Sequence, residues 1–421
     1  MNSSTMDKYF DLVMKTAAAD QTEIVIYTES SALTRFSNSA IHQNMAENNS
    51  AISIKSISNG KIGTAFTNKT DDRSIIDTVK AAEKNASLSP KDDDFKTLPT
   101  GKAVISTNGY IDDTAKASPG FRADVVADII KLTDKHDLMA AGSFSTTAGL
   151  IGVANSLGAK SIGKITEANL NLVIIGADSS SYAEFYDKDV NNLRLESMVN
   201  KAIEKTLLSA GPKKVEPGKY DVILEPAAVA DMLGFLAYSG LGAQAVREHR
   251  SFMNNNFGRR LISPLVSFWD DANDPETIGL PFDFEAVPKQ KVIFFDKGIA
   301  KNVVYDSYTA NREGKTSTGH ALPAPNTFGP VPLNMIMKAG NSSIEEMVDS
   351  KQKGILVTRF HYTNFEDPLK TIFTGMTRDG TFLIENGKIV SGIKNLRFTQ
   401  SILAALDKVE MITKDRHLVK A

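Results

Sequence analysis

The N-terminal part of the chain alternates between helical and strand-like spacing of apolar side chains. Apolar positions that recur every three to four residues predict a helix from Ser4 or Thr5 to about Ala19. A second helix is expected from Asp71 or Asp72 to about Ala86. Between them, β-branched and alternating segments predict four strands, at Glu23–Tyr27, Thr34–Asn44, Ala51–Ile57 and Lys61–Asn68.

The middle of the chain continues this mixture and then breaks. Residues 87–100 are polar and contain proline, which is typical of an exposed loop. A helix at 121–136, strands within 138–187 and a long helix at 193–210 are expected next. Pro217 and Gly218 then interrupt both periodicities, so we predict an N-terminal α+β domain at 1–212, with an antiparallel sheet because Asn59-Gly60 favours a hairpin.

Residues 213–421 are expected to form a strand-rich, barrel-like domain, which makes the whole chain α+β. A strand at 220–224 is followed by Pro226, a residue suited to the first turn of a helix. The further strands predicted are 291–295, 335–339, 354–361 and a hairpin at 381–390, whose turn is Asn386-Gly387.

Composition excludes several functions. Of the 421 residues, 42% are apolar and 23% are charged, and the net charge of −2 predicts no general attraction to nucleic acid. The chain contains no cysteine, which removes disulfides, thiolate ligands and cysteine nucleophiles together. The N-terminus does not resemble a signal peptide, and no stretch approaches the ~20 apolar residues that span a bilayer. We therefore expect a cytoplasmic protein.

Motifs of known chemistry are also missing. No two histidines lie four residues apart, so none can form an H-E-x-x-H pair. No Gly-x-Ser-x-Gly elbow and no phosphate-binding loop occurs. The acidic run 270–274 fits a cation site or, more simply, a solvated turn. The segment 247–260, which contains Arg and Phe residues, fits either nucleic-acid binding or one face of a helix and the turn after it.

Several stretches, in order along nearly the whole chain, resemble the TldD/PmbA family, whose members are described as modulators of DNA gyrase. The stretches are 33–44, 153–158, 279–287, 305–321, 385–389 and 394–401. Proteolytic members of the family carry H-E-x-x-x-H on a helix of the second domain and a later cysteine as third zinc ligand. The similar stretch here runs from Gly234 to Ser239, with Gly234, Phe235 and Ser239 at the three motif positions, so the resemblance implies no catalytic residue and no metal ligand in this chain.

This pattern resembles the TldE-like branch of the family. The resemblance implies a non-catalytic subunit that pairs with a TldD-like metallopeptidase or with itself and helps to enclose unfolded peptides. Zinc is then expected only in the TldD-like partner, with no cofactor in this chain, and neither membrane nor nucleic acid is expected as a partner. Two rival functions remain: a stand-alone peptidase with an atypical metal site built on His249, His320 or His361, and a gyrase-associated regulator that acts through 247–260.

Six residues are candidates for a peptide groove: Asn155, Ser156, Arg312, Ser317, Thr318 and His320. Thr318 and His320 could donate hydrogen bonds to a peptide, or His320 could pack structurally beside a turn at Gly319. Asn155 and Ser156 also suit a structural hairpin. On the helix that replaces the zinc motif, we expect Phe235 and Tyr238 to be buried and to fill the space that ligands and metal occupy in active relatives.

Overall fold

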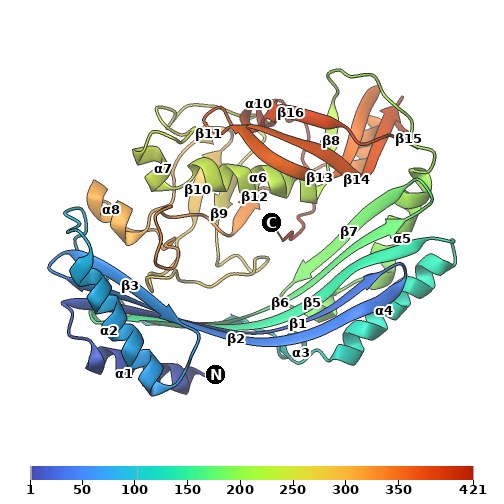
Figure 1. Cartoon of the computed structure of the whole chain (residues 1–421). Coiled ribbons are helices and arrows are strands. Elements are labelled where there is room, and N and C mark those ends of the chain that lie inside the picture. The colour runs from blue at the N-terminus through green and yellow to red at the C-terminus, as the bar shows by residue number, and fades with distance from the viewer. Residues whose placement is uncertain (1, 102, 421) are drawn as a thin grey trace.

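One large, curved sheet forms the N-terminal half of the computed structural model, which describes residues 2–101 and 103–420 (Figure 1). Its seven strands follow the order β3-β2-β1-β5-β6-β4, and β7 also pairs with β6. The elements of this half are α1 Ser3–Thr16, β1 Gln21–Ser37, β2 Ala40–Ser58, β3 Lys61–Thr67, α2 Asp72–Leu88, β4 Val104–Gly109, α3 Asp112–Ala115, α4 Pro119–Asp134, β5 Met139–Asn155, β6 Lys160–Ile175, β7 Ser180–Asp187, the 3-10 turn Val190–Asn192 and α5 Leu195–Leu208. The strands are antiparallel except for β4 against β6.

The strands β1 and β2 form one long hairpin rather than the separate strands that the sequence suggested. Asn38 and Ser39 adopt positive φ angles of 51° and 54°, as a tight hairpin turn requires. The predicted strand Thr34–Asn44 is therefore wrong, because it runs across this turn. The second predicted turn, Asn59-Gly60, is confirmed and connects β2 to β3.

Helices cover one face of the sheet at its two ends (Figure 1). At one end α1 and α2 pack on β1, β2 and β5 through a cluster that includes Met6, Phe10 and Ile24. At the other end α4 and α5 pack on β5 and β6 around Phe144. At the start of α2 the side chain of Asp71, one of the two residues expected there, accepts the N–H of Ser74. The expected start of the first helix at Ser4 or Thr5 is wrong, because Asn2 caps α1.

The C-terminal half contains two further sheets. The four-stranded sheet has the order β11-β10-β9-β12, and the five-stranded sheet has the order β15-β14-β13-β8 with β16 paired to β14. The elements are β8 Val222–Leu224, α6 Pro226–Gly240, α7 Ala243–Arg247, β9 Phe268–Asp270, β10 Val292–Asp296, β11 Ile299–Ala300, α8 Ser307–Glu313, β12 Met335–Met337, α9 Ile344–Asp349, β13 Lys353–Asp367, β14 Ile372–Glu385, β15 Lys388–Gly392, β16 Arg397–Ser401 and α10 Ile402–Asp407. The α+β class and the strand-rich second half are confirmed, but in the described part of the chain neither sheet closes into a barrel. The predicted domain boundary at 212/213 stays a prediction.

The C-terminal half lies over the concave side of the large sheet and contacts it at both ends (Figure 1). At one end Phe282 packs against Val25 and Ile151 of the sheet. At the other end the Ser180 hydroxyl donates a hydrogen bond of 2.8 Å to Asp379. Among the described residues, no helix is long and apolar enough to cross a membrane.

Candidate functional site

Helix α6 is the element that resembles the family's metal-binding helix, and its sequence explains its position. Pro226 stands in the first turn, where its missing N–H costs nothing. Met232, Leu233 and Leu236 are buried in the core of the C-terminal half. Asp231, three residues before Gly234, is close enough to Glu184 of β7 for their charges to interact. One side of α6 therefore faces the large sheet.

The three positions of the missing motif lie in different surroundings. A Cβ atom on Gly234 would meet nothing within 4 Å, so this position faces open space. Phe235 packs edge-on against Phe365, with ring centroids 4.7 Å apart. Ser239 is buried, and its hydroxyl has no hydrogen-bond partner. Glycine and phenylalanine offer no ligand atom, and a zinc site needs about three protein ligands, so these residues do not fit zinc.

Both aromatic rings were expected to be buried, but Phe235 is only half-buried and Tyr238 lies on the surface, so the expectation is wrong for Tyr238. Phe235 is half-buried and also contacts Phe373, at 5.7 Å between ring centroids. Tyr238 is 60% exposed and stacks on Phe328 at 4.6 Å. The ring of Tyr238 thus covers the surface of α6 rather than its interior, and the space in front of Gly234 stays open.

A cluster of charged and polar groups joins α6 to β7, β13 and β14 at the junction of the two halves. Arg359 lies over the ring of Tyr182 at 4.1 Å and forms an ion pair with Asp379. The Tyr182 hydroxyl donates to one oxygen of Glu184, while the other oxygen of Glu184 is buried without a partner. Burial and the nearby Glu184 charge raise the pKa of Asp231 to about 6. A carboxyl that titrates near neutral pH can take up or release a proton under ordinary conditions.

Sequence inspection could not find this cluster. Asp231, Glu184 and Arg359 stand about 50 to 180 residues apart, and no local pattern links them. Next to them, Ser180 and Asp379 contribute to a polar depression that is also lined by residues 178–179, 209, 212, 380–381 and 393–395.

The groove candidates near residue 320 are buried and bonded to one another. One ring nitrogen of His320, Nε2, lies 3.0 Å from Asp270, and the other, Nδ1, lies 2.9 Å from the hydroxyl of Thr318. The Ser317 hydroxyl donates to the carbonyl of Tyr305. Burial alone would raise the pKa of Asp270, but the hydrogen bond to His320, the charges of His320 and Lys289 and the N–H of Asn334 together lower it. This geometry fits the structural alternative, because both nitrogens of the buried imidazole already have partners.

The remaining groove candidates lie elsewhere. Asn155 forms the hairpin between β5 and β6, where its side-chain oxygen accepts the N–H groups of Leu157 and Ala159. The adjacent Ser156 hydroxyl accepts the N–H of Thr22. Arg312, on α8, forms an ion pair with Asp94. The structure therefore brings Ser317, Thr318 and His320 together but does not join them to the other three.

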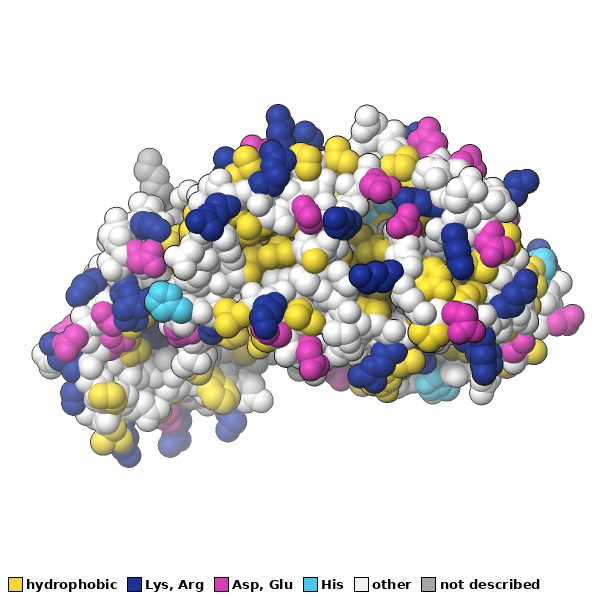
Figure 2. All heavy atoms as spheres, turned by 90° about the horizontal axis from the view of Figure 1, so that it is seen from above, with side chains coloured by type: hydrophobic (Ala, Val, Ile, Leu, Met, Phe, Trp, Pro, Cys, Tyr) yellow, Lys and Arg dark blue, Asp and Glu magenta, His cyan; other side chains and the backbone are white. Residues whose placement is uncertain are grey.

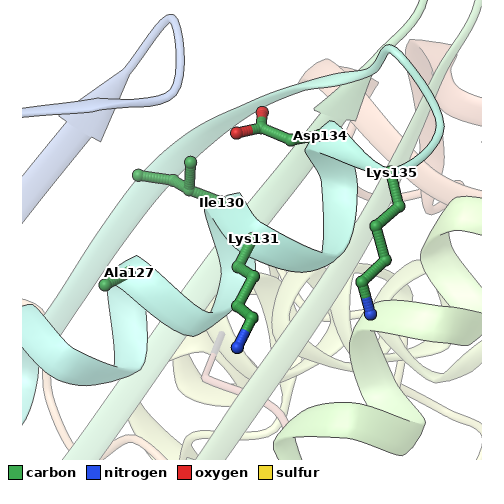
Figure 3. A pocket seen from close by; sticks show the side chains of 5 residues that line it. All are labelled: Ala127, Ile130, Lys131, Asp134 and Lys135. Atoms are coloured by element: carbon green, nitrogen blue, oxygen red, sulfur yellow. The ribbon is translucent and has the colours of Figure 1, made fainter.

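Surface features add no further candidate for a ligand site. The shallow depression in Figure 3 is lined by Ala127, Ile130, Lys131 and Asp134 of α4 and by Lys135, which directly follows that helix. In Figure 2, basic and acidic side chains intermingle over the face seen from above, so that face shows no broad field of one sign. The described residues contain no group of three or more His, Cys, Asp or Glu side chains that could hold a metal ion.

The segment 247–260 mixes exposed basic residues with core residues: Arg247, Arg259 and Arg260 are exposed, and a regulator role through this segment stays a prediction. Helix α7 ends at Arg247, and turns follow instead of a continued helix. Phe252 is 5% exposed and belongs to the core of the C-terminal half. Arg250 pairs with Glu248 and lies over the ring of Phe328.

The fold is that of a metallopeptidase family, as two family models show. Residues 217–421 match the model of the PmbA/TldA metallopeptidase C-terminal domain, and residues 22–86 match that of the PmbA/TldA metallopeptidase domain 1. Together these models cover more than half of the chain, which belongs to the TldD/PmbA family.

Relatives and solved structures agree with this family. A metalloprotease TldD homologue of Buchnera aphidicola is 27% identical over 57% of this chain and 50% of its own length. A metalloprotease of Methanocaldococcus jannaschii is 30% identical over 54% of this chain and 49% of its own length. These matches span about half the length of each relative.

The fold itself is shared over nearly the whole chain. The crystal structure of TldE from Thermococcus kodakarensis superimposes with a TM-score of 0.86 over 99% of this chain and 95% of that one, at 20% identity. A Thermotoga maritima protein described as a candidate modulator of a DNA gyrase gives the same TM-score and identity, over 99% and 96%.

Proposed function

We propose that this chain is a TldE-like, non-catalytic subunit of a cytoplasmic metallopeptidase complex that acts on unfolded peptides. The observation that carries the proposal is the chemistry of α6, where Gly234, Phe235 and Ser239 replace the ligands and the general base. A zinc hydrolase needs imidazole or thiolate ligands and a base for the metal-bound water. The chain keeps the family's fold and lacks these parts.

The role of the chain is then to pair and to enclose substrate. Its partner is a TldD-like metallopeptidase or a second copy, and zinc belongs to the TldD-like partner. The concave sheet and α6 form the walls against which an extended peptide lies. Extended peptides suit a strand-rich surface, because backbone hydrogen bonds give affinity without a fixed sequence. A closed space that admits only extended chain leaves folded proteins intact.

The test compares two samples: this chain alone, and this chain mixed with a TldD-like partner from the same source. We expect no stoichiometric zinc by elemental analysis in the purified chain and no cleavage of an unfolded peptide by the chain alone. With the partner, cleavage should appear, and a chelator should abolish it. The metal-depleted partner with this chain is the matched control. About one zinc per chain together with chelator-sensitive cleavage by the chain alone would contradict the proposal.

A further inference from the structure

The segment 413–420 passes from the C-terminal half to the concave side of the large sheet. It begins paired to the C-terminal half, where the N–H of Gly340 donates to the carbonyl of Thr413 and the N–H of Lys414 donates to the carbonyl of Ser342. Residues 414–420 form no helix or strand. Figure 1 shows this segment, the last part of the red trace, in the space between the C-terminal half and the sheet. The segment therefore lies where the proposed function places an extended peptide.

Two cations hold the far part of this segment to carboxylates. The Lys420 ammonium donates a hydrogen bond of 2.8 Å to Glu167 of β6. The Arg416 guanidinium pairs with Asp274 at 3.5 Å and also with Glu276. Asp274 belongs to the acidic run that fits either a cation site or a solvated turn by its sequence. The cation beside Asp274 is a side chain of this same chain.

The surface beneath Lys420 is the concave face of the sheet. On β6, the even-numbered residues from 168 to 174 pack toward α4 and α5, so Glu167 and the other odd-numbered residues point to the opposite face. On β7, Glu184 and Tyr186 stand opposite odd-numbered residues of β6 and share this face. The Lys420 ammonium lies 5.4 Å from the ring centre of Tyr186. Carboxylates and an aromatic ring, which both attract ammonium and guanidinium groups, therefore line this part of the sheet.

The loop 271–277 flanks the same part of the sheet. The ammonium of Lys188, which directly follows β7, donates to the carbonyl of Pro275 at 3.0 Å. The pairing of β7 with β6 starts one residue before Lys188 and one residue after Glu167. One anionic position on this loop and one on β6 are therefore within reach of two cations that stand four residues apart in one chain. We call the four residues around these cations the acidic floor: Glu167, Tyr186, Asp274 and Glu276.

The contacts of the segment are of a kind that another peptide can replace. The Lys420 side chain is 51% exposed and that of Arg416 is 32% exposed, although Glu167 and Asp274 are less exposed. Ion pairs of such exposed groups contribute little to stability and are screened by salt. A segment that is tethered beside its site competes through a high effective concentration rather than through strong contacts. A peptide with the same charges should therefore bind once the tethered segment is released.

We propose that the acidic floor binds extended peptides that carry Lys or Arg side chains about four residues apart, and that residues 415–420 occupy this site as an internal competitor. The site selects basic peptides because their cations take the places of Arg416 and Lys420. The inference rests on the proposed function only for the statement that the bound peptide is a substrate. The binding itself needs neither a partner chain nor zinc.

The test measures how a labelled peptide with the sequence of residues 413–420 binds to the full chain, without partner or metal. Arg416→Gln together with Lys420→Gln removes both cations of the tethered segment. This double variant should bind the peptide about tenfold more tightly than the wild type, because the internal competitor is lost. Lys388→Gln together with Lys408→Gln removes the same charge from exposed positions elsewhere and should bind the peptide as the wild type does.

The acidic floor is tested in the double variant Arg416→Gln, Lys420→Gln. Adding Glu167→Gln should weaken peptide binding by about threefold, because one ion pair is lost. A peptide with glutamine in place of its arginine and lysines should bind more weakly, and added salt should weaken the basic peptide. Melting temperatures should stay close to that of the wild type, because only exposed ion pairs are removed.

Three results would each overturn the inference. The first is equal peptide affinity of the wild type and the double variant, and the second is an unchanged affinity after Glu167→Gln. The third is binding of the glutamine peptide as tightly as the basic one. An absence of cleavage with a TldD-like partner would contradict the proposed function but would leave these affinities as they are, so the two failures can be told apart.

Discussion

Replacing Lys55 by methionine tests what holds the two halves of the molecule together. Lys55, on β2, lies 3.2 Å from a carboxylate oxygen of Glu23 and 3.9 Å from one of Glu285. Glu23 belongs to the large sheet and Glu285 to the C-terminal half, so one ammonium group bridges both. Burial lowers the pKa of Lys55, but the two carboxylates outweigh that effect and the pKa is raised.

The size of the effect follows from the burial of the carboxylates. Glu23 is 2% exposed and Glu285 is 9% exposed, and one oxygen of Glu23 has no hydrogen-bond partner even in the wild type. Removing one member of a buried ion pair typically costs 3–5 kcal/mol, because the other charge stays buried alone. The Lys55 side chain is 14% exposed, which favours the lower end. We expect a loss of about 3 kcal/mol, or roughly 6–10 °C in melting temperature.

The assay is thermal and urea unfolding of Lys55→Met beside Lys8→Met. Lys8 pairs with Asp72 at 2.9 Å on the surface, where both side chains are more than half exposed. Surface pairs contribute about 0–1 kcal/mol, so this control should unfold almost as the wild type does. Adding Glu23→Gln to Lys55→Met should restore part of the loss, because it removes an unpaired buried charge. The reasoning is refuted if the two single variants lose equal stability.

Two further predictions concern α6 and Asp283, a carboxyl that is buried in the C-terminal half. The triple variant Gly234→His, Phe235→Glu and Ser239→His should lose about 2–4 kcal/mol of folding stability. Most of this loss should come from Phe235→Glu, because it removes aromatic packing, whereas Gly234→His alone should be tolerated. Tight zinc binding with normal folding, measured by metal titration and calorimetry, would contradict this prediction. Burial and Glu285 raise the pKa of Asp283 to about 7, so the folded state keeps a proton that the unfolded state releases above about pH 4. The stability that this proton contributes is complete at low pH and is lost as pH rises to about 7. The melting temperature of Asp283→Asn should therefore fall less steeply between pH 5.5 and 7.5 than that of the wild type. An unchanged slope would show that other groups cause the pH dependence.

Much of the local structure follows from the chain itself. The turn at Asn59-Gly60, the start of α6 at Pro226 and the helix near 72–88 agree with short-range signals. The turn at Asn38-Ser39 was missed, since an Asn-Ser pair is a weaker turn signal than Asn-Gly. The strands of the C-terminal half were predicted individually, but nothing local shows that they form two open sheets.

The sequence by itself determined the α+β class, the family resemblance and the absence of both an H-E-x-x-x-H motif and cysteine, because each depends on which residues are present and on their spacing along the chain. Only the tertiary structure decided that His320 is bonded to Asp270, that Gly234 faces open space and that Tyr238 lies on the surface. It also decided that β3 pairs with β2 only from Ile52 to Ser58. The physical reason is that burial, charge interaction and strand pairing depend on segments far apart in the chain, whose approach is set by packing of the whole molecule rather than by local pattern.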